Sequence, residues 1–460
     1  MTKASGSKRK RQSNHSVYLP NHIIDRIFTF LPIKDVVSYS AVAIPFLNTW
    51  MYARNLRFDS LFKSNCVTKD ISIINKILHS HLGKKIYNFH LYIPSPKDYS
   101  FFLKDWIQIL ASKGLEELEI DLWFTSNDKN TYYMDSDFID HIETLRRVKL
   151  TNCELRISPN LKSLRFLKSL SLTKAPITPH FIQELFRNCV VLESLSLVFC
   201  SSTTNVIIKG SKQLRTILIR ACGKICLIII DDPNIHTFHY EGEIDKIKLI
   251  GPTKLEDVIF NFNTITWVQH ISGMGNLIDI LRNVQTLTIN NIFLEGISPR
   301  YEDFEYKDME LYLPNLKELQ IVLHGSTYVN PWDIISFVKN CPQIERLFIN
   351  LGDYYAMEGG SYWNFVAKEK FENCQVGFSK LKLLKVKGYK KGELEEKLVN
   401  FIMMRAKMME SLILVSKNKH LEIRSKDIVT VSKLVTISTY YNNRDKSSVF
   451  PKHTILSMQN

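Results

Sequence analysis

The residues that could carry catalytic or metal chemistry are few, and none of them forms a complete set. Cys222-Gly-Lys-Ile-Cys226 is spaced like half of a metal site, but no second Cys or His pair follows at ligand spacing. Both cysteines fall in or near predicted buried strands, so we interpret them as core residues. A glycine-rich phosphate loop and the Gly-x-Ser-x-Gly pattern are absent, and the 13 His are scattered. We therefore predict no catalytic residue, no metal site and no cofactor, and we expect that the protein is not an enzyme.

The charge of the chain is concentrated at its two ends. The 460 residues carry a net charge of +14, and 45% of them are hydrophobic, which is typical of a folded protein. Residues 1–14 contain five Lys/Arg and no acid, residues 376–460 contain 17 Lys/Arg against 7 Asp/Glu, and the remainder is almost neutral. A nucleic-acid-binding body would be basic across its working face. We therefore expect no nucleic-acid partner.

The first twenty residues are polar and basic and lack the apolar core of a secretory signal. The longest purely apolar run is far shorter than the roughly 20 residues that cross a bilayer, so no membrane association is expected. We predict a location in the nucleus and/or the cytoplasm, with the eight Cys reduced. The run Lys8, Arg9, Lys10 and Arg11 could be a nuclear import signal, and the alternative is a solvated basic tail.

One six-residue pattern, apolar-x-x-apolar-x-apolar, recurs thirteen times along the chain. Most of the steps between copies are 20 to 29 residues long, which is typical of leucine-rich repeats. A further match at Ile244 falls inside one step and is interpreted as a partial unit. The copies begin at Ile86, Leu115, Leu145, Leu167, Leu192, Leu214, Ile235, Leu255, Val284, Leu316, Ile344, Leu381 and Met409.

Each copy alternates apolar and polar residues at its end, as a strand buried on one face does. Because the copies recur at a fixed period, the strands should stack in parallel and bury their apolar edges against one another. Helical patterns before Cys189 and before Cys341 predict helices in two of the return segments. Units of 20–22 residues are too short for a full helix and should return as extended or 3₁₀ segments. The expected fold is an irregular α/β repeat solenoid with a parallel concave sheet.

Residues 15–60 do not follow this repeat. Leu19-Pro20 opens a helical stretch with apolar residues on one face, and Leu31-Pro32 ends it. Two further short helical stretches follow, from Ile33 and from Pro45. Three short helices make a unit too small to bury its own apolar surface. We therefore expect it to expose an apolar face to a partner.

The stretch that begins Leu19-Pro-Asn-His-Ile-Ile-Asp-Arg-Ile-Phe-Thr-Phe-Leu-Pro resembles an F-box, in the form found in plant F-box/leucine-rich-repeat proteins. Lys34 to Val37, Ser40 and Trp50 match this pattern in register, and Asn55-Leu-Arg-Phe-Asp59 resembles the segment that follows the box. Residues 388–410 resemble the FBD-type ending of the same proteins. One departure is Ala43-Ile44-Pro45-Phe46, where the family has a run like Ser-Lys-Arg-Trp, so a basic pair is lost and a proline enters.

The resemblance implies the substrate-recognition subunit of an SCF-type cullin ubiquitin ligase. The F-box would bind a Skp-type adaptor and through it a cullin, and the repeats would bind an unknown protein target for ubiquitin-dependent degradation. One alternative is a protein-interaction scaffold that does not lead to degradation. Another is a ligand-gated receptor, which a deep pocket with convergent Arg and Lys on the repeat face would favour.

The expected adaptor contact uses apolar residues of the box, although several of them are alternatively the core of the small unit. They are Leu19, Pro20, Ile23, Ile24, Ile27, Leu31, Pro32, Val36 and Val37. The expected target contact uses outward strand positions and an aromatic insert at 352–363. The alternatives are solvated strand positions and an insert that packs on the solenoid edge. The target residues are Arg220, His239, Glu241, Asn261, Arg346, Phe348, Asn350, Tyr354, Tyr355 and Trp363.

These expectations divide the chain into six parts. The predicted domains are a basic disordered tail at 1–14, an F-box at 15–60, a linker at 61–85, leucine-rich repeats at 86–375, C-terminal repeats with the FBD-like segment at 376–440, and a tail at 441–460.

Overall fold

The computed structural model describes most of the chain and divides it into two compact units, Met1–Phe124 and Thr125–Asn460. The described residues are 20–28, 31, 33–40, 48–62, 67–94, 96–122, 132–134, 141–155, 163–202, 205–209, 211, 213–251, 254–263, 277–297, 311–352, 354–356, 367–416, 428–432, 435–441 and 447–453. No helix among these residues is long and apolar enough to cross a bilayer.

The first unit combines short helices with three parallel strands in the order β1-β2-β3. Trp106 is fully buried between two of its helices and donates a hydrogen bond from Nε1 to Asn75 Oδ1 at 3.0 Å. The predicted third box helix appears as a 3₁₀ turn, η2, while Ala43 to Phe46 lie outside the described residues. The elements are α1 (Asn21–Phe28), α2 (Ile33–Ser40), η2 (Thr49–Tyr52), β1 (Asn55–Phe58), α3 (Val67–His79), β2 (Asn88–Ile93), α4 (Pro96–Ser112) and β3 (Glu117–Leu122).

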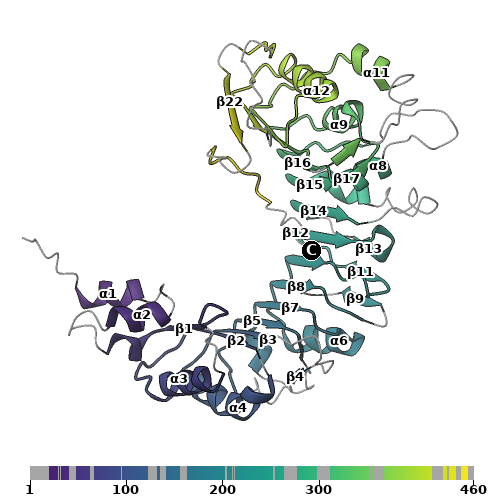
Figure 1. Ribbon diagram of the computed structural model, residues 1–460. Coiled ribbons are helices and arrows are strands. Elements are labelled where there is room, and N and C mark those ends of the chain that lie inside the picture. Colours follow the sequence, from purple (N-terminus) through teal and green to yellow (C-terminus); the bar gives the residue numbers. More distant parts are fainter. Residues whose placement is uncertain are drawn as a thin grey trace, which may run out of the picture. The chain divides into compact units, whose positions relative to one another are not determined.

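The second unit is built on a curved sheet of twelve parallel strands that neighbour one another in chain order (Figure 1). Its core consists of aligned apolar rows: Leu170, Leu195 and Ile217 are paired across three adjacent strands and are fully buried. The strands are β5 (Arg147–Thr151), β7 (Ser169–Thr173), β8 (Ser194–Val198), β10 (Thr216–Arg220), β12 (Thr237–Gly242), β14 (Asp257–Phe262), β15 (Thr286–Asn290), β16 (Glu318–Val322), β18 (Arg346–Asn350), β20 (Leu383–Lys387), β21 (Ser411–Ser416) and β22 (Thr436–Tyr441).

The predicted leucine-rich-repeat fold is confirmed strand by strand. Every one of the thirteen pattern copies begins two residues before a strand, from Ile86 before β2 to Met409 before β21. The first apolar residue of a copy is therefore buried at the entry to the strand, and the fourth and sixth point into the core. Of the three strands of the first unit and the twelve of the second, β1 and β22 are not preceded by one of the thirteen copies, although Ala53, Leu56 and Phe58 around β1 have the same spacing and are buried.

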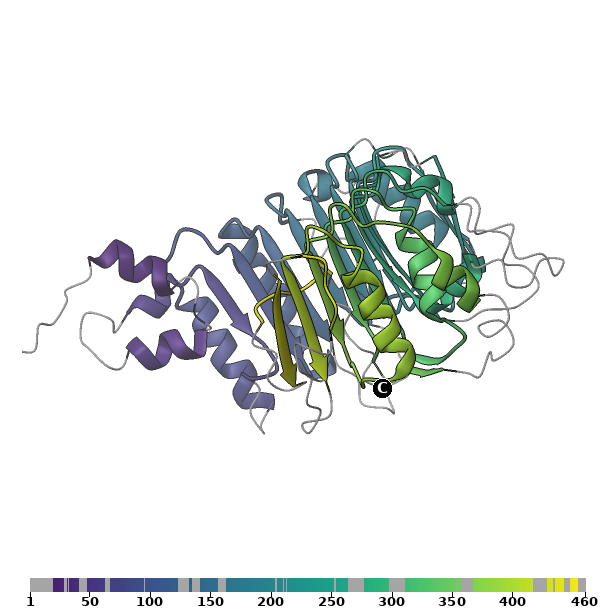
Figure 2. The same cartoon turned by 90° about the horizontal axis from the view of Figure 1, so that it is seen from above.

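The return segments cover one side of the twelve-stranded sheet, as the two views show (Figures 1 and 2). The helices predicted before Cys189 and Cys341 are present as α6 (Pro179–Asn188) and α9 (Pro331–Val338). The short repeats instead return as extended chain, which forms a second parallel sheet of β13 (Ile247–Ile250), β11 (Ile228–Asp231) and β9 (Val206–Lys209), in that order. A repeat of 20–22 residues has too few residues left after its main strand for a helix of ordinary length. Ile244 begins a 3₁₀ turn, η4, that leads into this second sheet, so it is not a main-sheet repeat.

The remaining elements of the second unit are short. The helices are α6 (Pro179–Asn188), α8 (Asn291–Ile297), α9 (Pro331–Val338), α11 (Lys368–Asn373) and α12 (Glu393–Met403), the last within the FBD-like segment. The second sheet contains β9 (Val206–Lys209), β11 (Ile228–Asp231) and β13 (Ile247–Ile250). Two small pairs are β4 (Tyr132–Met134) with β6 (Cys153–Leu155), and β17 (Gly325–Thr327) with β19 (Tyr354–Ala356). The 3₁₀ turns are η3 (Ser163–Phe166), η4 (Ile244–Lys246) and η5 (Leu281–Asn283).

Candidate functional site

The concave face of the second unit is the side of its curved sheet that faces away from the return segments. On β7, β8 and β10 the outward residues are half-buried and alternate with buried core residues. On β16, by contrast, all five residues are buried. Thr288 of β15 and Phe348 of β18 also point outward and are nearly inaccessible. Something therefore covers this face over β14 to β20.

The cover is a C-terminal segment, Ser447–His453, which we call the C-terminal strap. It runs across the strands from β20 back to β14. Lys385 Nζ donates to Ser447 Oγ at 2.9 Å and to Val449 O at 2.6 Å, and Arg346 Nη2 donates to Phe450 O at 2.9 Å. At the far end, the backbone N–H of Lys452 donates to Glu318 Oε1 at 2.6 Å. In Figure 1 the strap is the yellow segment beside the sheet, on the side away from α9.

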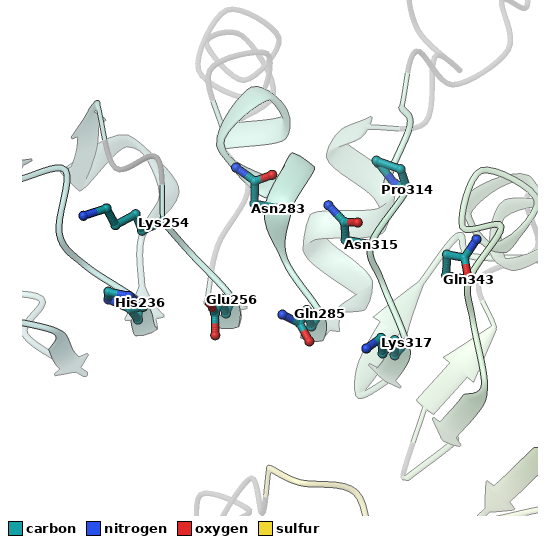
Figure 3. A pocket seen from close by; sticks show the side chains of 9 residues that line it. All are labelled: His236, Lys254, Glu256, Asn283, Gln285, Pro314, Asn315, Lys317 and Gln343. Atoms are coloured by element: carbon teal, nitrogen blue, oxygen red, sulfur yellow. The ribbon is translucent and has the colours of Figure 1, made fainter.

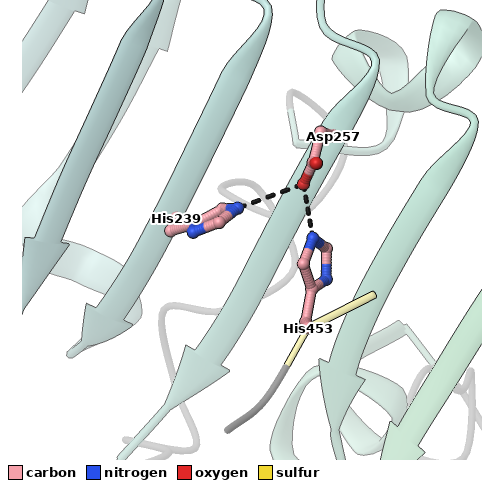
Figure 4. Close-up of side chains that lie close together, drawn as sticks. All are labelled: His239, Asp257 and His453. Carbon is pink, nitrogen blue, oxygen red and sulfur yellow. Dashed lines mark hydrogen bonds and ion pairs between the residues drawn. The ribbon is translucent and has the colours of Figure 1, made fainter. Parts of the chain in front are cut away.

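The strap ends in a cluster of ionisable side chains around Asp257. His239 Nε2 donates to Asp257 Oδ1 at 3.1 Å, and His453 Nε2 donates to the same oxygen at 2.5 Å (Figure 4). The ammonium of Lys452 contacts the other carboxylate oxygen. Burial by itself raises the pKa of Asp257, but the hydrogen bonds from the two histidines and Lys452 outweigh it and hold the pKa well below its usual value. Asp257 is therefore a carboxylate at neutral pH.

One atom from each of His239, Asp257 and His453 lies within 4.8 Å of the others, which is compatible with a metal-ligand set. The direct hydrogen bonds and the Lys452 ion pair already satisfy the carboxylate, however, and Thr288 Oγ1 lies 2.8 Å from His453 Nδ1. We therefore interpret the group as a hydrogen-bonded ion cluster that anchors the strap.

A small apolar patch lies under the other end of the strap. Phe348, Leu383, Ile413 and Val415 form a buried cluster on neighbouring strands, and Val449 of the strap and Tyr440 of β22 pack against it. The ammonium of Lys385 lies 4.8 Å from the centre of the Phe450 ring, which itself is largely exposed. The strap is thus held by one apolar contact, several bonds to its backbone and one acidic site.

A separate polar groove of about 600 Å³ lies at the amino-terminal ends of β12 to β18 (Figure 3). Much of its polar lining is used within the chain: Lys254 Nζ donates to Asn234 Oδ1 at 3.0 Å, and Asn315 Nδ2 donates to Arg282 O at 3.3 Å. Its charges do not converge on one point. The lining residues are His236, Lys254, Glu256, Asn283, Gln285, Pro314, Asn315, Lys317 and Gln343.

The first unit exposes apolar side chains on its two opening helices. Ile23 and Ile27 lie one turn apart on α1, and Val37 lies on α2, with exposed fractions of 36%, 45% and 40%. Val36, by contrast, is completely buried together with Ile33, so it belongs to the core of the unit. The exposed set forms what we call the box face.

Residues 77–440 match the leucine-rich-repeat domain described as At1g61320/AtMIF1. The chain belongs to the plant family of FBD-associated F-box/leucine-rich-repeat proteins. Two Arabidopsis thaliana relatives span nearly the whole chain. The FBD-associated F-box protein At1g61330 is 26% identical over 91% of this chain and 95% of its own length, and At1g61320 is 23% identical over 94% and 95%.

A third relative, the Arabidopsis thaliana F-box/FBD/LRR-repeat protein At1g13570, is 24% identical over 66% of this chain and 74% of its own length. Among solved structures, Rad7 in the yeast Rad7–Elc1 complex aligns with 90% of this chain and 96% of that chain at 13% identity. Its TM-score of 0.31 is too low to support an argument. The family resemblance expected from the sequence is thus confirmed by the domain match and by the relatives.

The structure of this F-box/LRR protein brings some of the predicted target residues together. Arg220 Nε pairs with Glu241 Oε2 at 2.7 Å on the concave face. Asn261 Oδ1 accepts from Asn290 Nδ2 at 3.1 Å, and Asn350 Oδ1 accepts from the backbone N–H of Gly352, so both serve the fold.

The other predicted target residues differ in their positions. His239, Arg346 and Phe348 lie under or beside the strap. Tyr354 and Tyr355 lie on β19, which pairs with β17 and not with the main sheet, and their side chains are not described. Trp363 and the import-signal residues Lys8 to Arg11 fall outside the described residues.

The six predicted adaptor residues whose side chains are described separate into three groups. Pro20, Ile23, Ile27 and Val37 are exposed, Leu31 is half-buried, and Val36 is buried. Ile24 lies on α1, but its side chain is not described, and Leu19 and Pro32 fall outside the described residues. The exposed residues are consistent with an adaptor contact, which remains a proposal. Val36 instead belongs to the core of the unit, as the alternative interpretation expected.

The interpretation of Cys222 and Cys226 as two core residues is half wrong. Cys222 is buried, and its Sγ donates to Leu197 O at 3.5 Å, whereas Cys226 is exposed. The residue Cys226 lies in the turn before β11, where the chain has left the main strand and not yet entered the second sheet.

Sequence reasoning missed Asp257, Thr288, Glu318 and Lys385, and it treated the strap as a tail. The four side chains occupy the third or fifth position of their pattern copies, the same outward positions that selected Arg346 and Phe348. The signal for them was therefore present. The strap carries no copy of the pattern, and no local signal indicates its contact with the sheet.

Proposed function

We propose that this protein is the substrate-recognition subunit of an SCF-type cullin ubiquitin ligase. The box face binds a Skp-type adaptor and through it a cullin, and the concave face of the repeats binds a protein target for ubiquitin-dependent degradation. The chain itself is a non-catalytic adaptor. Family membership supports the proposal, and the exposed apolar side chains of α1 and α2 are the observation that carries it.

The box face is suited to a protein contact because it leaves apolar surface of α1 and α2 exposed to water. Full burial of one such side chain contributes about 1.5–3 kcal/mol. Ile23, Ile27 and Val37 are each only partly exposed, so together they supply a few kcal/mol. That is enough to decide whether a micromolar contact forms, because about 1.4 kcal/mol changes an equilibrium constant tenfold.

The first test is Ile27→Asp in the full chain. A carboxylate placed in the contact must lose its water on binding, so the affinity for a purified Skp-type adaptor should fall at least tenfold in isothermal titration calorimetry. The matched control is Leu82→Asp, which makes the same change at an exposed position of the same unit outside α1 and α2 and should bind like the wild type. Undiminished binding by Ile27→Asp would remove the box face from the proposal.

The target side is tested by affinity capture from plant extract with the wild type and Ile27→Asp. Proteins lost with Ile27→Asp are ligase subunits, and proteins kept by both are candidate targets. A kept protein should accumulate in cells that express only Ile27→Asp, because it is bound but not ubiquitinated. If the wild type captures no adaptor, the non-degradative scaffold replaces the ligase subunit as the interpretation.

A further inference from the structure

The C-terminal strap binds the concave face in the way that a peptide ligand binds a receptor. From β14 to β20 there are four strand spacings, roughly 19 Å in all at about 4.8 Å each. The six residue steps from Ser447 to His453 span about 20 Å when extended. The strap therefore crosses the strands as a largely extended segment with one turn at Ser448, whose φ is +52°. Pro451 favours the extended part because it restricts both its own backbone and that of Phe450.

The side chains that hold the strap bind mainly groups that any extended peptide has. Lys385 and Arg346 donate to the carbonyl oxygens of Val449 and Phe450, and Glu318 accepts a backbone N–H. Lys385 is 4% exposed and forms these bonds from inside the interface. Such contacts bind a backbone without selecting its sequence.

Selectivity comes from the two ends of this site. Val449 packs, partly buried, against the apolar patch that includes Phe348, Leu383 and Ile413. Three residues later, Lys452 and His453 both reach the buried carboxylate of Asp257. An apolar residue and a Lys-His pair at this spacing are thus the features that the face distinguishes, whereas the Phe450 ring remains mostly exposed.

We propose that the concave face over β14 to β20 is a binding site for an extended peptide with an apolar residue followed three positions later by Lys-His, and that the C-terminal strap occupies it as an internal competitor. A target segment of this chemistry binds by displacing the strap. The identity of the ligand as a ubiquitination target rests on the proposed function, but the peptide site does not.

The competing explanation is that the strap only covers the sheet and does not compete with a ligand. The two explanations predict different binding of a free peptide that has the sequence of the strap. An attached segment has a local concentration on the order of millimolar. The wild type should therefore bind an added copy of the strap weakly. A chain whose own strap has lost its anchors should bind the copy far more tightly, since the acidic site and the apolar patch remain in the sheet.

The experiment uses the full chain and a fluorescein-labelled, end-capped peptide with the sequence of residues 447–453. Fluorescence anisotropy should show at least tenfold tighter binding to Lys452→Ala/His453→Ala than to the wild type. Binding should be lost when alanine replaces the Lys and His of the peptide itself, a control that leaves the protein unchanged. In the Lys452→Ala/His453→Ala background, Asp257→Asn should weaken binding, and Asp279→Asn, an exposed acid outside the face, should not.

The proposal is overturned if the peptide binds the wild type and the double variant equally, if it binds neither, or if the alanine peptide binds as well as the original. Lys452→Ala alone is measured as a second variant. It ensures that the result does not depend on a fold destabilised by two substitutions. Adaptor binding to the box face is measured on the same preparations. Peptide binding without adaptor binding contradicts only the proposed function, and the reverse result contradicts only this inference.

Discussion

His81 is a buried histidine that links two segments of the first unit. Its Nε2 donates to Ala53 O at 2.9 Å, and Lys113 Nζ donates to His81 O at 3.1 Å. Burial, and to a lesser degree the charge of Lys113, lower the pKa of His81 from its ordinary value of 6.5, against the opposing effect of the bond to Ala53. The neutral ring is therefore the form that the fold selects.

This selection makes stability depend on pH in a defined direction. The unfolded chain takes up a proton near pH 6.5, whereas the folded chain does so only at lower pH, so the free energy of unfolding must decline as the pH falls through 6.5. In urea unfolding between pH 7.5 and 5.5, the free energy of unfolding of His81→Gln should decline less than that of the wild type. The reason is that the amide keeps a donor for Ala53 O and does not titrate. Identical slopes for His81→Gln and the wild type would contradict the assignment.

At the scale of elements, the return helix α9 begins at a complete capping box. Asn330 Oδ1 accepts from the backbone N–H groups of Trp332 and Asp333, and Asp333 Oδ2 accepts from the backbone N–H of Asn330 at 2.8 Å. Pro331 occupies the first helical position, where its missing N–H costs nothing. The helix is buried along its whole length, so water cannot replace these bonds.

Removal of this cap should therefore be costly for so short a helix. Asn330→Ala should lower the free energy of unfolding by about 1–2 kcal/mol. Asn330→Ser keeps a side-chain oxygen at the cap and should lose less than half of that amount. Chemical denaturation monitored by circular dichroism measures both. Equal losses for the two variants would show that the amide is needed for another contact.

At the scale of the whole molecule, the second unit is a stack in which each strand is stabilised by its two neighbours. Leu195 of β8 is fully buried and paired with Leu170 on one side and Ile217 on the other. In such an array a local loss weakens the adjacent repeats first, because contacts run from neighbour to neighbour.

Leu195→Ala should lower the free energy of unfolding by roughly 2–5 kcal/mol, the range for buried leucines. Hydrogen exchange should accelerate most in β7, β8 and β10 and least in β20 and β21. Ser196→Ala, an outward change on the same strand, is the control and should leave the exchange pattern unchanged. Uniform acceleration across the unit would indicate that the stack unfolds as a single block.

Much of this architecture could be predicted because its signals are local. The pattern at Leu167 or Leu192 places an apolar residue two positions before a strand and two more inside it, and thirteen repetitions specify the register. The length of a repeat decides its return, so the extended β9 and β11 follow from steps of 22 and 21 residues, respectively. The apolar spacing of Ile23 and Ile27 likewise predicts a face on α1 that its own unit does not bury.

The amino-acid sequence by itself thus determined where the strands begin, which faces are apolar and which family the chain resembles. Only the tertiary structure decided that Lys452 and His453 lie on Asp257, 196 residues before His453. The reason is physical: each strand is encoded by a few neighbouring residues, but the strap binds a surface that exists only after β14, β16, β18 and β20 have stacked side by side. No spacing within residues 447–453 reveals that surface.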